Sequence, residues 1–149
     1  MRIEEIFQKK NKMYECEPIC CDDPQPLIPD GIYQAQVLKW ERGRYYNQTK
    51  LYLWFEIISP GRAFETKLFM VLNLNGNKVG YGSKYYRSWV IANHGIRPRR
   101  NDRLSPKIFL NKVFKVKVET VKRSYTGESV PEYLQYSVIR EILDLEAGS

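Results

Sequence analysis

The feature that most constrains the fold of this chain is a strict alternation of side chains over residues 51–58. One phase of the alternation consists of Leu51, Leu53, Phe55 and Ile57, and the other consists of Tyr52, Trp54 and Glu56. Because successive side chains of a β-strand point to opposite faces, this pattern predicts a strand with one buried face and one outer face. The dipeptide Pro60-Gly61, which follows, predicts a turn.

Four further segments have the length and the residue types of short strands: 31–41, 64–72, 113–121 and 134 to about 142. Their alternation predicts these buried side chains: Phe64, Leu68, Met70, Leu72, Phe114, Val116 and Val118. The opposite phase predicts these outward side chains: Lys67, Phe69, Lys115 and Lys117. The segments 42–48 and 122–131 contain Gly and polar residues, which predicts loops between the paired strands.

Between the third and fourth of these strands the chain has helical spacing. Ser83 is a fair N-cap for a helix that runs to about Asn93, and Gly95 is well placed to end it. Most of the aromatic residues on this helix are expected in the core, and these are Tyr85, Tyr86 and Trp89. The predicted fold class is therefore mainly β, a five-stranded antiparallel barrel of the oligonucleotide/oligosaccharide-binding (OB) type with one helix between strands 3 and 4. An open five-stranded sheet with one helix is the alternative.

Residues 1–29 predict an extension in front of a domain that spans 30–149. Ile3, Ile6 and Phe7 could line one face of a short helix, and four prolines between residues 18 and 29 exclude regular structure there. We interpret this segment as a flexible or loosely docked arm.

The charge of the chain favours a polyanionic partner. The formal net charge is +7. Residues 1–29 hold four Lys/Arg against six Asp/Glu, so residues 30–149 hold twenty against eleven and carry +9. Basic charge concentrated in the folded part is typical of nucleic-acid-binding proteins, although many basic proteins bind nothing anionic.

From Gly31 onward the chain resembles OB-fold single-stranded DNA-binding proteins of phages and mobile elements. The resemblance rests on Gly31-Ile32-Tyr33, on residues 51–57 and on Lys67-Leu68-Phe69-Met70 as the openings and centres of the first three strands. It implies a role in DNA replication or recombination. It covers the pattern of strands and turns, and the extension at 1–29 has no counterpart in it.

Cations and aromatic rings alternate in the first predicted hairpin, and single-stranded nucleic acid needs both, since phosphates attract Lys and Arg while bases stack on rings. The candidate nucleic-acid-binding residues of this hairpin are Trp40, Arg42, Arg44, Tyr45, Tyr46, Lys50, Tyr52 and Trp54, joined by Lys67 and Phe69 of the third strand. In OB-folds, strands 2 and 3 and the loops 1–2 and 4–5 form the binding face. The alternative is that Tyr52 and Trp54 pack under the helix or in a dimer interface.

Two further basic clusters are candidates for phosphate contacts. The first consists of Arg97, Arg99 and Arg100, followed by Arg103, and Asp102 could neutralise part of it. The second consists of Lys115, Lys117, Lys122, Arg123 and Tyr125. For each cluster a solvated charged surface is the alternative.

The sequence offers little for catalysis or metal binding. His94 is the only histidine, and no Ser–His–Asp arrangement, phosphate-binding Gly loop or H-E-x-x-H motif is present. Cys16 and Cys20 have the spacing of half a zinc site without a second pair, so free thiols are the expectation. We expect no catalytic residues, no metal and no cofactor.

No apolar run is long enough to cross a membrane, the amino terminus lacks an apolar signal region, and three Cys argue against a secreted disulfide scaffold, so we expect a cytoplasmic protein.

The sequence therefore predicts a sequence-tolerant single-stranded nucleic-acid-binding protein that is not an enzyme, with DNA favoured over RNA and a homo-oligomer left open. A protein-interaction module that uses the aromatic face is the first alternative, and a nucleic-acid-processing enzyme is the second.

Overall fold

The structure, a computed structural model, describes residues 18–45 and 47–147. Its five strands are β1 (Gly31–Tyr45), β2 (Gln48–Ile57), β3 (Lys67–Leu74), β4 (Val113–Val121) and β5 (Tyr136–Ala147). The helix α2 (Lys84–Ala92) lies between β3 and β4, and short 3₁₀ turns precede β4 (Pro106–Phe109) and β5 (Glu132–Leu134).

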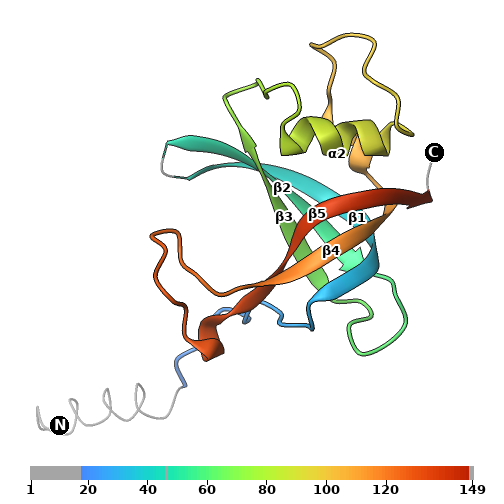
Figure 1. The fold of residues 1–149 in the computed structure, drawn as a ribbon. Helices are drawn as coiled ribbons and strands as arrows, with labels where there is room; N and C mark the ends of the chain where they lie inside the picture. The colour runs from blue at the N-terminus through green and yellow to red at the C-terminus, as the bar shows by residue number, and fades with distance from the viewer. Residues whose placement is uncertain (1–17, 46, 148–149) are drawn as a thin grey trace, which may run out of the picture.

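All five strands belong to one antiparallel sheet in the order β3-β2-β1-β4-β5 (Figure 1). The predicted class is confirmed: mainly β, five antiparallel strands, and a single helix between the third and fourth. The sheet curls so that its two edge strands, β3 and β5, approach each other, with the rings of Phe69 and Tyr136 6.3 Å apart. No hydrogen-bonded ladder joins these two edges in the described part of the chain, so closure into a barrel stays a prediction.

The core follows the predicted alternation. Ten of the eleven side chains expected inside are buried: Leu51, Leu53, Phe55, Ile57, Leu68, Met70, Leu72, Phe114, Val116 and Val118. The prediction for Phe64 was wrong, because its side chain is 51% exposed. Residues 60–66 form a turn in which the Phe64 amide donates to the Gly61 carbonyl (3.2 Å), so alternation begins only at Lys67 and the buried position in the turn belongs to Ala63.

The first hairpin is longer than its sequence suggests. Residues 42–48 were expected to form a loop, but β1 continues to Tyr45 and β2 begins at Gln48, with Arg42 opposite Leu51 in the ladder. The reversal falls at Asn47, whose φ of 61° is a left-handed conformation that Asn tolerates better than most residues. A register shift between Val37 and Lys39 bends β1 before this extension.

Helix α2 begins and ends where its capping residues predict. The Ser83 hydroxyl accepts a hydrogen bond from the Tyr86 amide (3.2 Å), as an N-cap should. At the other end, Gly95 has a φ of 77° and its amide donates to the Val90 carbonyl (2.8 Å). The Lys112 ammonium donates to the Ala92 carbonyl (2.9 Å), a cation at the negative end of the helix dipole, and burial lowers the pKa of Lys112.

The end of the amino-terminal segment docks against β5. The Ser137 amide donates to the Pro26 carbonyl (2.9 Å), and the Ile28 amide donates to the Ser137 hydroxyl (2.8 Å). Ile28 also packs against the core. Residues 18–26 are exposed, including Cys20 and Cys21, whereas the expected helix at residues 3–7 and Cys16 lie outside the described residues.

The last strand starts later than expected. Residue 134 belongs to the 3₁₀ turn Glu132–Leu134, which follows Pro131, so β5 begins at Tyr136 and runs on to Ala147.

Candidate nucleic-acid interface

Aromatic rings gather on the outer surface of β2 and β3. We call this surface the aromatic face, and it consists of Tyr52, Trp54, Phe69 and Tyr136. Trp54 lies opposite Phe69 in the ladder, with ring centroids 5.3 Å apart, and the Tyr52 and Phe69 rings meet edge to face at 5.8 Å. The alternation places Tyr52, Trp54 and Phe69 away from the core, as the sequence predicts, and all four rings are partly exposed.

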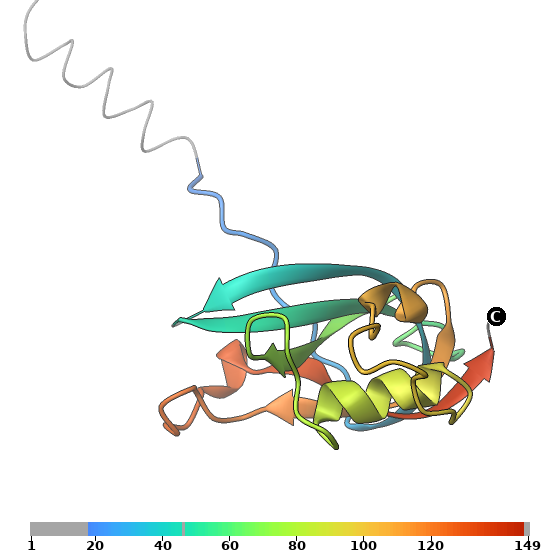
Figure 2. The ribbon, with the colours of Figure 1, turned by 90° about the horizontal axis from the view of Figure 1, so that it is seen from above.

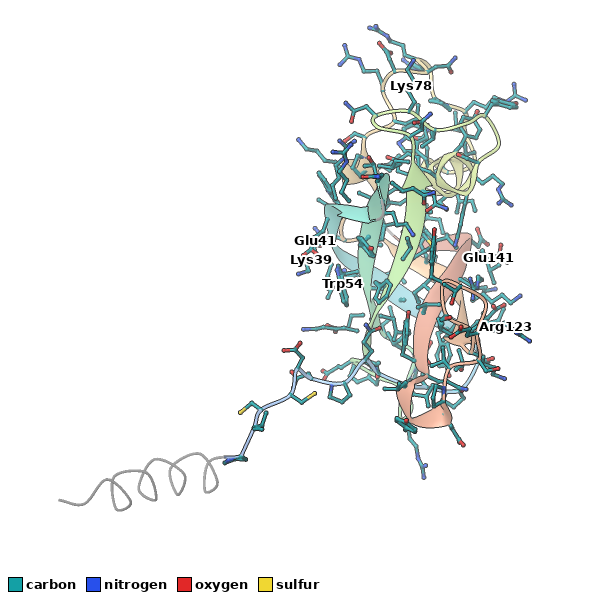
Figure 3. The ribbon with its side chains drawn as sticks, turned by 90° about the vertical axis from the view of Figure 1, so that its left-hand side faces the viewer. Lys39, Glu41, Trp54, Lys78, Arg123 and Glu141 are labelled. Carbon is teal, nitrogen blue, oxygen red and sulfur yellow. The ribbon has the colours of Figure 1, made fainter. Side chains whose placement is uncertain are left out.

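One edge of the Trp54 indole is buried, and a cation lies over its ring. The Lys39 ammonium lies 5.7 Å from the centre of the indole and is paired with Glu41 at 2.9 Å. The three residues lie together in Figure 3. The indole N–H is enclosed and has no hydrogen-bond partner among the described residues. A ligand would therefore meet the face of the ring rather than its N–H, and it would have to displace Lys39.

Two polar segments flank the aromatic face. The tip of the β1–β2 hairpin and the β4–β5 loop (residues 122–131) project from the same side of the molecule (Figures 1 and 2). The loop carries Lys122, Arg123 and Tyr125. The Arg123 guanidinium donates to the Gly127 carbonyl (3.0 Å), which braces the loop, and Tyr125 is 72% exposed.

The aromatic face also has cations at both ends. Lys50 lies opposite Asn73 and Lys67 lies opposite Glu56, and all four positions share the outward phase of Tyr52. Lys67 is exposed. The surface thus combines rings in its centre with Lys50 at one end and Lys67, opposite Glu56, at the other, and the flanking β4–β5 loop adds further cations.

The other candidates of the first hairpin lie on its opposite side. Trp40 faces the same way as Leu53 and packs against the core. Arg42 pairs with Leu51 and Arg44 with Thr49, so neither shares the phase of the aromatic face. The backbone of Tyr45 is in β1, and Tyr46 lies outside the described residues.

The arginine cluster lies in the loop between α2 and the 3₁₀ turn at Pro106. Arg97 and Arg99 are exposed, and the Arg100 guanidinium donates two hydrogen bonds to the Asp102 carboxylate (bidentate, 3.0 and 3.1 Å). In Figure 1 this loop extends beyond α2, at the opposite end of the molecule from the β4–β5 loop. The structure therefore does not bring the cluster to the aromatic face.

Lys115 and Lys117 lie on the outer surface of β4, and each has an acidic partner. Lys117 pairs with Glu119 at 3.2 Å, and Lys115 pairs with Glu146 at 3.9 Å. Hydrogen bonds from Lys117 and from Arg140 lower the pKa of Glu119. β1 separates this surface from β2, and Val121, which pairs with Tyr136, lies four residues beyond Lys117, so these lysines do not join the aromatic face.

The aromatic residues of α2 belong mostly to the core, as expected. Tyr85 and Trp89 are buried, and their polar atoms donate to the carbonyls of Leu104 (2.7 Å) and Ser105 (3.2 Å), respectively. Burial raises the pKa of Tyr85 to about 12. Tyr86 is partly exposed and lies against Tyr81, with ring centroids 5.0 Å apart.

Sequence reasoning missed two residues of this surface. Tyr136 joins the aromatic face only because β5 curls back to β3, and no pattern within residues 134–142 reveals that contact. Lys39 was not a candidate, although its position two residues before Glu41 and next to Trp40 was visible.

Comparison with known proteins finds no family model and no curated sequence that matches this chain. Within residues 18–45 and 47–147, no cluster of His, Cys, Asp and Glu could hold a metal ion. None of the helices described in that part of the chain is long and apolar enough to cross a bilayer.

Proposed function

We propose that this protein binds single-stranded DNA, by stacking bases on the aromatic face and by contacting phosphates with the cations around it. The observation that carries the proposal is the row of partly exposed rings on β2 and β3, with Trp54 and Phe69 at its centre. Such rings expose apolar area that a base can cover, and stacking works for every base because each has a π-face.

The flanking segments support a strand rather than a duplex. Single strands offer unstacked bases and a flexible backbone, and the hairpin tip and the β4–β5 loop could follow that backbone on either side of the rings. A duplex offers no free base face to Trp54. The setting in phage or mobile-element replication or recombination, and the preference for DNA over RNA, rest on the resemblance of the strand pattern to OB-fold proteins.

Lys39 gives the proposal a specific detail. It lies over Trp54 and is paired with Glu41. When a base takes its place on the indole, we expect the freed ammonium to contact a phosphate of the bound strand. Binding would thus exchange an exposed ion pair for a phosphate contact.

The test replaces Trp54 by Ala and measures binding of fluorescent dT, dC, dA, rU and duplex oligonucleotides at two salt concentrations. Stacking contributes roughly 1–3 kcal/mol per base, so we expect Trp54→Ala to weaken binding to each single-stranded DNA about five- to hundred-fold. Duplex binding should barely change. Tyr81→Ala is the matched control, because it removes a 79% exposed ring from a different surface.

Melting curves separate loss of binding from loss of fold. A Trp54→Ala variant that melts far earlier than the wild type would assign the ring to the core. Normal melting with unchanged affinity would remove the aromatic face from the site. Binding of an unrelated protein, in the absence of any salt-dependent binding of dT, would favour the interaction module instead.

A further inference from the structure

A groove of about 800 Å³ lies on the side of the β1–β2 hairpin opposite to the aromatic face. Its walls come from the hairpin, from the loop after β3, from α2 and from the segment 101–106. Its floor is apolar, and the side chains that form it are Leu51, Leu74, Val79, Tyr85 and Leu104.

Three cations line this groove: Arg42, Lys78 and Arg103. None of them has an ion pair within the described residues. The one acidic group of the lining, Asp102, forms a bidentate ion pair with Arg100. The groove therefore has a net positive lining.

The position of Arg42 is set by its neighbours. Its guanidinium donates to the Asn77 side-chain oxygen (2.6 Å), which links the hairpin to the loop after β3. A guanidinium has five N–H donors, so this single bond leaves donors for an anion. Arg42 thereby points to the same loop that carries Lys78.

The aromatic face and the groove lie on opposite sides of the hairpin and come together at the end of β3. Along β2 and β3 the outward pairs run from Trp54 and Phe69 through Tyr52 and Val71 to Lys50 and Asn73. The next residue after Asn73 is Leu74, which lines the groove, and Lys78 follows in the loop. Figure 3 shows Lys78 at one end of the molecule, beyond the strands that carry Trp54.

We propose that the groove takes further nucleotides of the same DNA strand, with their phosphates on Arg42 and Lys78 and a base against the apolar floor. The strand would leave the aromatic face over the end of β3 and enter the groove beside Leu74. An apolar floor with a cationic rim matches a nucleotide, which is a flat ring attached to an anion. The inference rests on the proposed function and extends its site size.

The experiment compares short and long oligo-dT, of about 4 and about 16 nucleotides, the two ends of the range that OB-folds cover. The variant is Arg42→Ala with Lys78→Ala. Its matched control is Lys115→Ala with Lys117→Ala, which removes the same charge from the outer surface of β4. Each phosphate contact on a single strand makes log K fall more steeply with log salt, by about 0.7 in slope. This corresponds to about fivefold in affinity at 0.1 M salt.

We expect the groove variant to bind the long oligonucleotide about 25-fold more weakly, with the salt slope reduced by about 1.4. Binding of the short oligonucleotide should change less than about twofold, and the control should lose little at either length. Should the double variant melt early, Lys78→Ala alone, at an exposed loop residue, replaces it with an expected loss of about fivefold.

Two results would overturn the inference and leave the proposed function standing. One is an equal loss of affinity for short and long oligonucleotides, which would mean that the groove cations attract DNA at the aromatic face over a distance and contact no further nucleotides. The other is no loss at either length while Trp54→Ala still weakens binding. If the wild type binds neither oligonucleotide, both proposals fail.

Discussion

The outer surface of β2 and β3 and the outer surface of β1 and β4 are built by the same alternation but carry different chemistry. On β2 and β3 the outward side chains are rings in mutual contact, with Trp54 against Phe69. On β1 and β4, Ile32 lies opposite Lys117 and Gln34 opposite Lys115. Both lysines on that surface are paired with acidic groups.

The difference indicates which surface can form additional favourable interactions with a partner. An exposed ion pair already satisfies most of its own charge and contributes little more to a partner. Exposed rings leave apolar area in water, which only a ligand or another chain can cover. The aromatic face is therefore the surface on which a partner gains most, and the surface of β1 and β4 serves as an internal control for it.

The largest effect is expected from removing two rings of the aromatic face at once. Tyr52→Ala with Phe69→Ala should weaken single-stranded DNA binding by about 30-fold or more, at roughly 1 kcal/mol or more per ring. Titration with fluorescent oligo-dT measures the loss. Ile32→Ala with Gln34→Ala makes the same number of changes on β1 and should alter affinity less than about twofold.

Comparable losses in the two double variants would break the distinction between the surfaces. Circular dichroism melts of both variants check that each retains the fold, since all four side chains lie outside the core.

A smaller effect is expected from single lysines on the two surfaces. Lys67→Ala removes an exposed cation from the end of the aromatic face, so affinity at 0.1 M salt should fall about fivefold and the salt slope by about 0.7. Lys117→Ala removes a cation already paired with Glu119 and should leave the slope unchanged. Binding isotherms at several salt concentrations give both slopes. A flatter slope of log K against log salt in the Lys117 variant alone would indicate that the DNA phosphates bind along β4 instead.

The fold could be predicted from the sequence wherever one strand face is buried. Period two places Leu53 and Val116 in the core because a one-residue slip would expose the whole apolar set. The pattern failed at Phe64, because a turn held by backbone hydrogen bonds leaves no trace in the spacing of apolar residues. It failed again at residues 42–45, where polar residues continue the strand and the side chains of Arg42 and Arg44 are exposed.

The candidate site could be predicted only one strand at a time. Alternation assigns Tyr52 and Trp54 to one surface, since they share a strand. It cannot assign Arg42 relative to Trp54, because that depends on the register across the hairpin and on the shift between Val37 and Lys39. Contacts between strands distant in sequence, such as Phe69 with Tyr136, come from the curl of the sheet alone.

The smallest effect is expected from acid titration of the ion pairs on β4 and β5. Glu119 accepts hydrogen bonds from Lys117 and Arg140, and these hold the pKa of its carboxyl group below its ordinary value. A carboxyl group with a lower pKa in the folded state stabilises the fold at pH values above its unfolded pKa. That contribution disappears as the pH falls through the folded pKa. The melting temperature of Glu119→Gln should therefore lie slightly below that of the wild type at pH 7, and the difference should shrink below about pH 4.5.

Arg140→Ala, which removes one of the two donors, should show part of the same pH dependence. Oligo-dT affinity at pH 7 should be unchanged in both variants, because the pair lies outside the aromatic face. A constant melting difference from pH 7 to pH 3 would mean that the carboxylate charge of Glu119 plays no part in stability, and a loss of DNA binding would mean that the two surfaces are not independent.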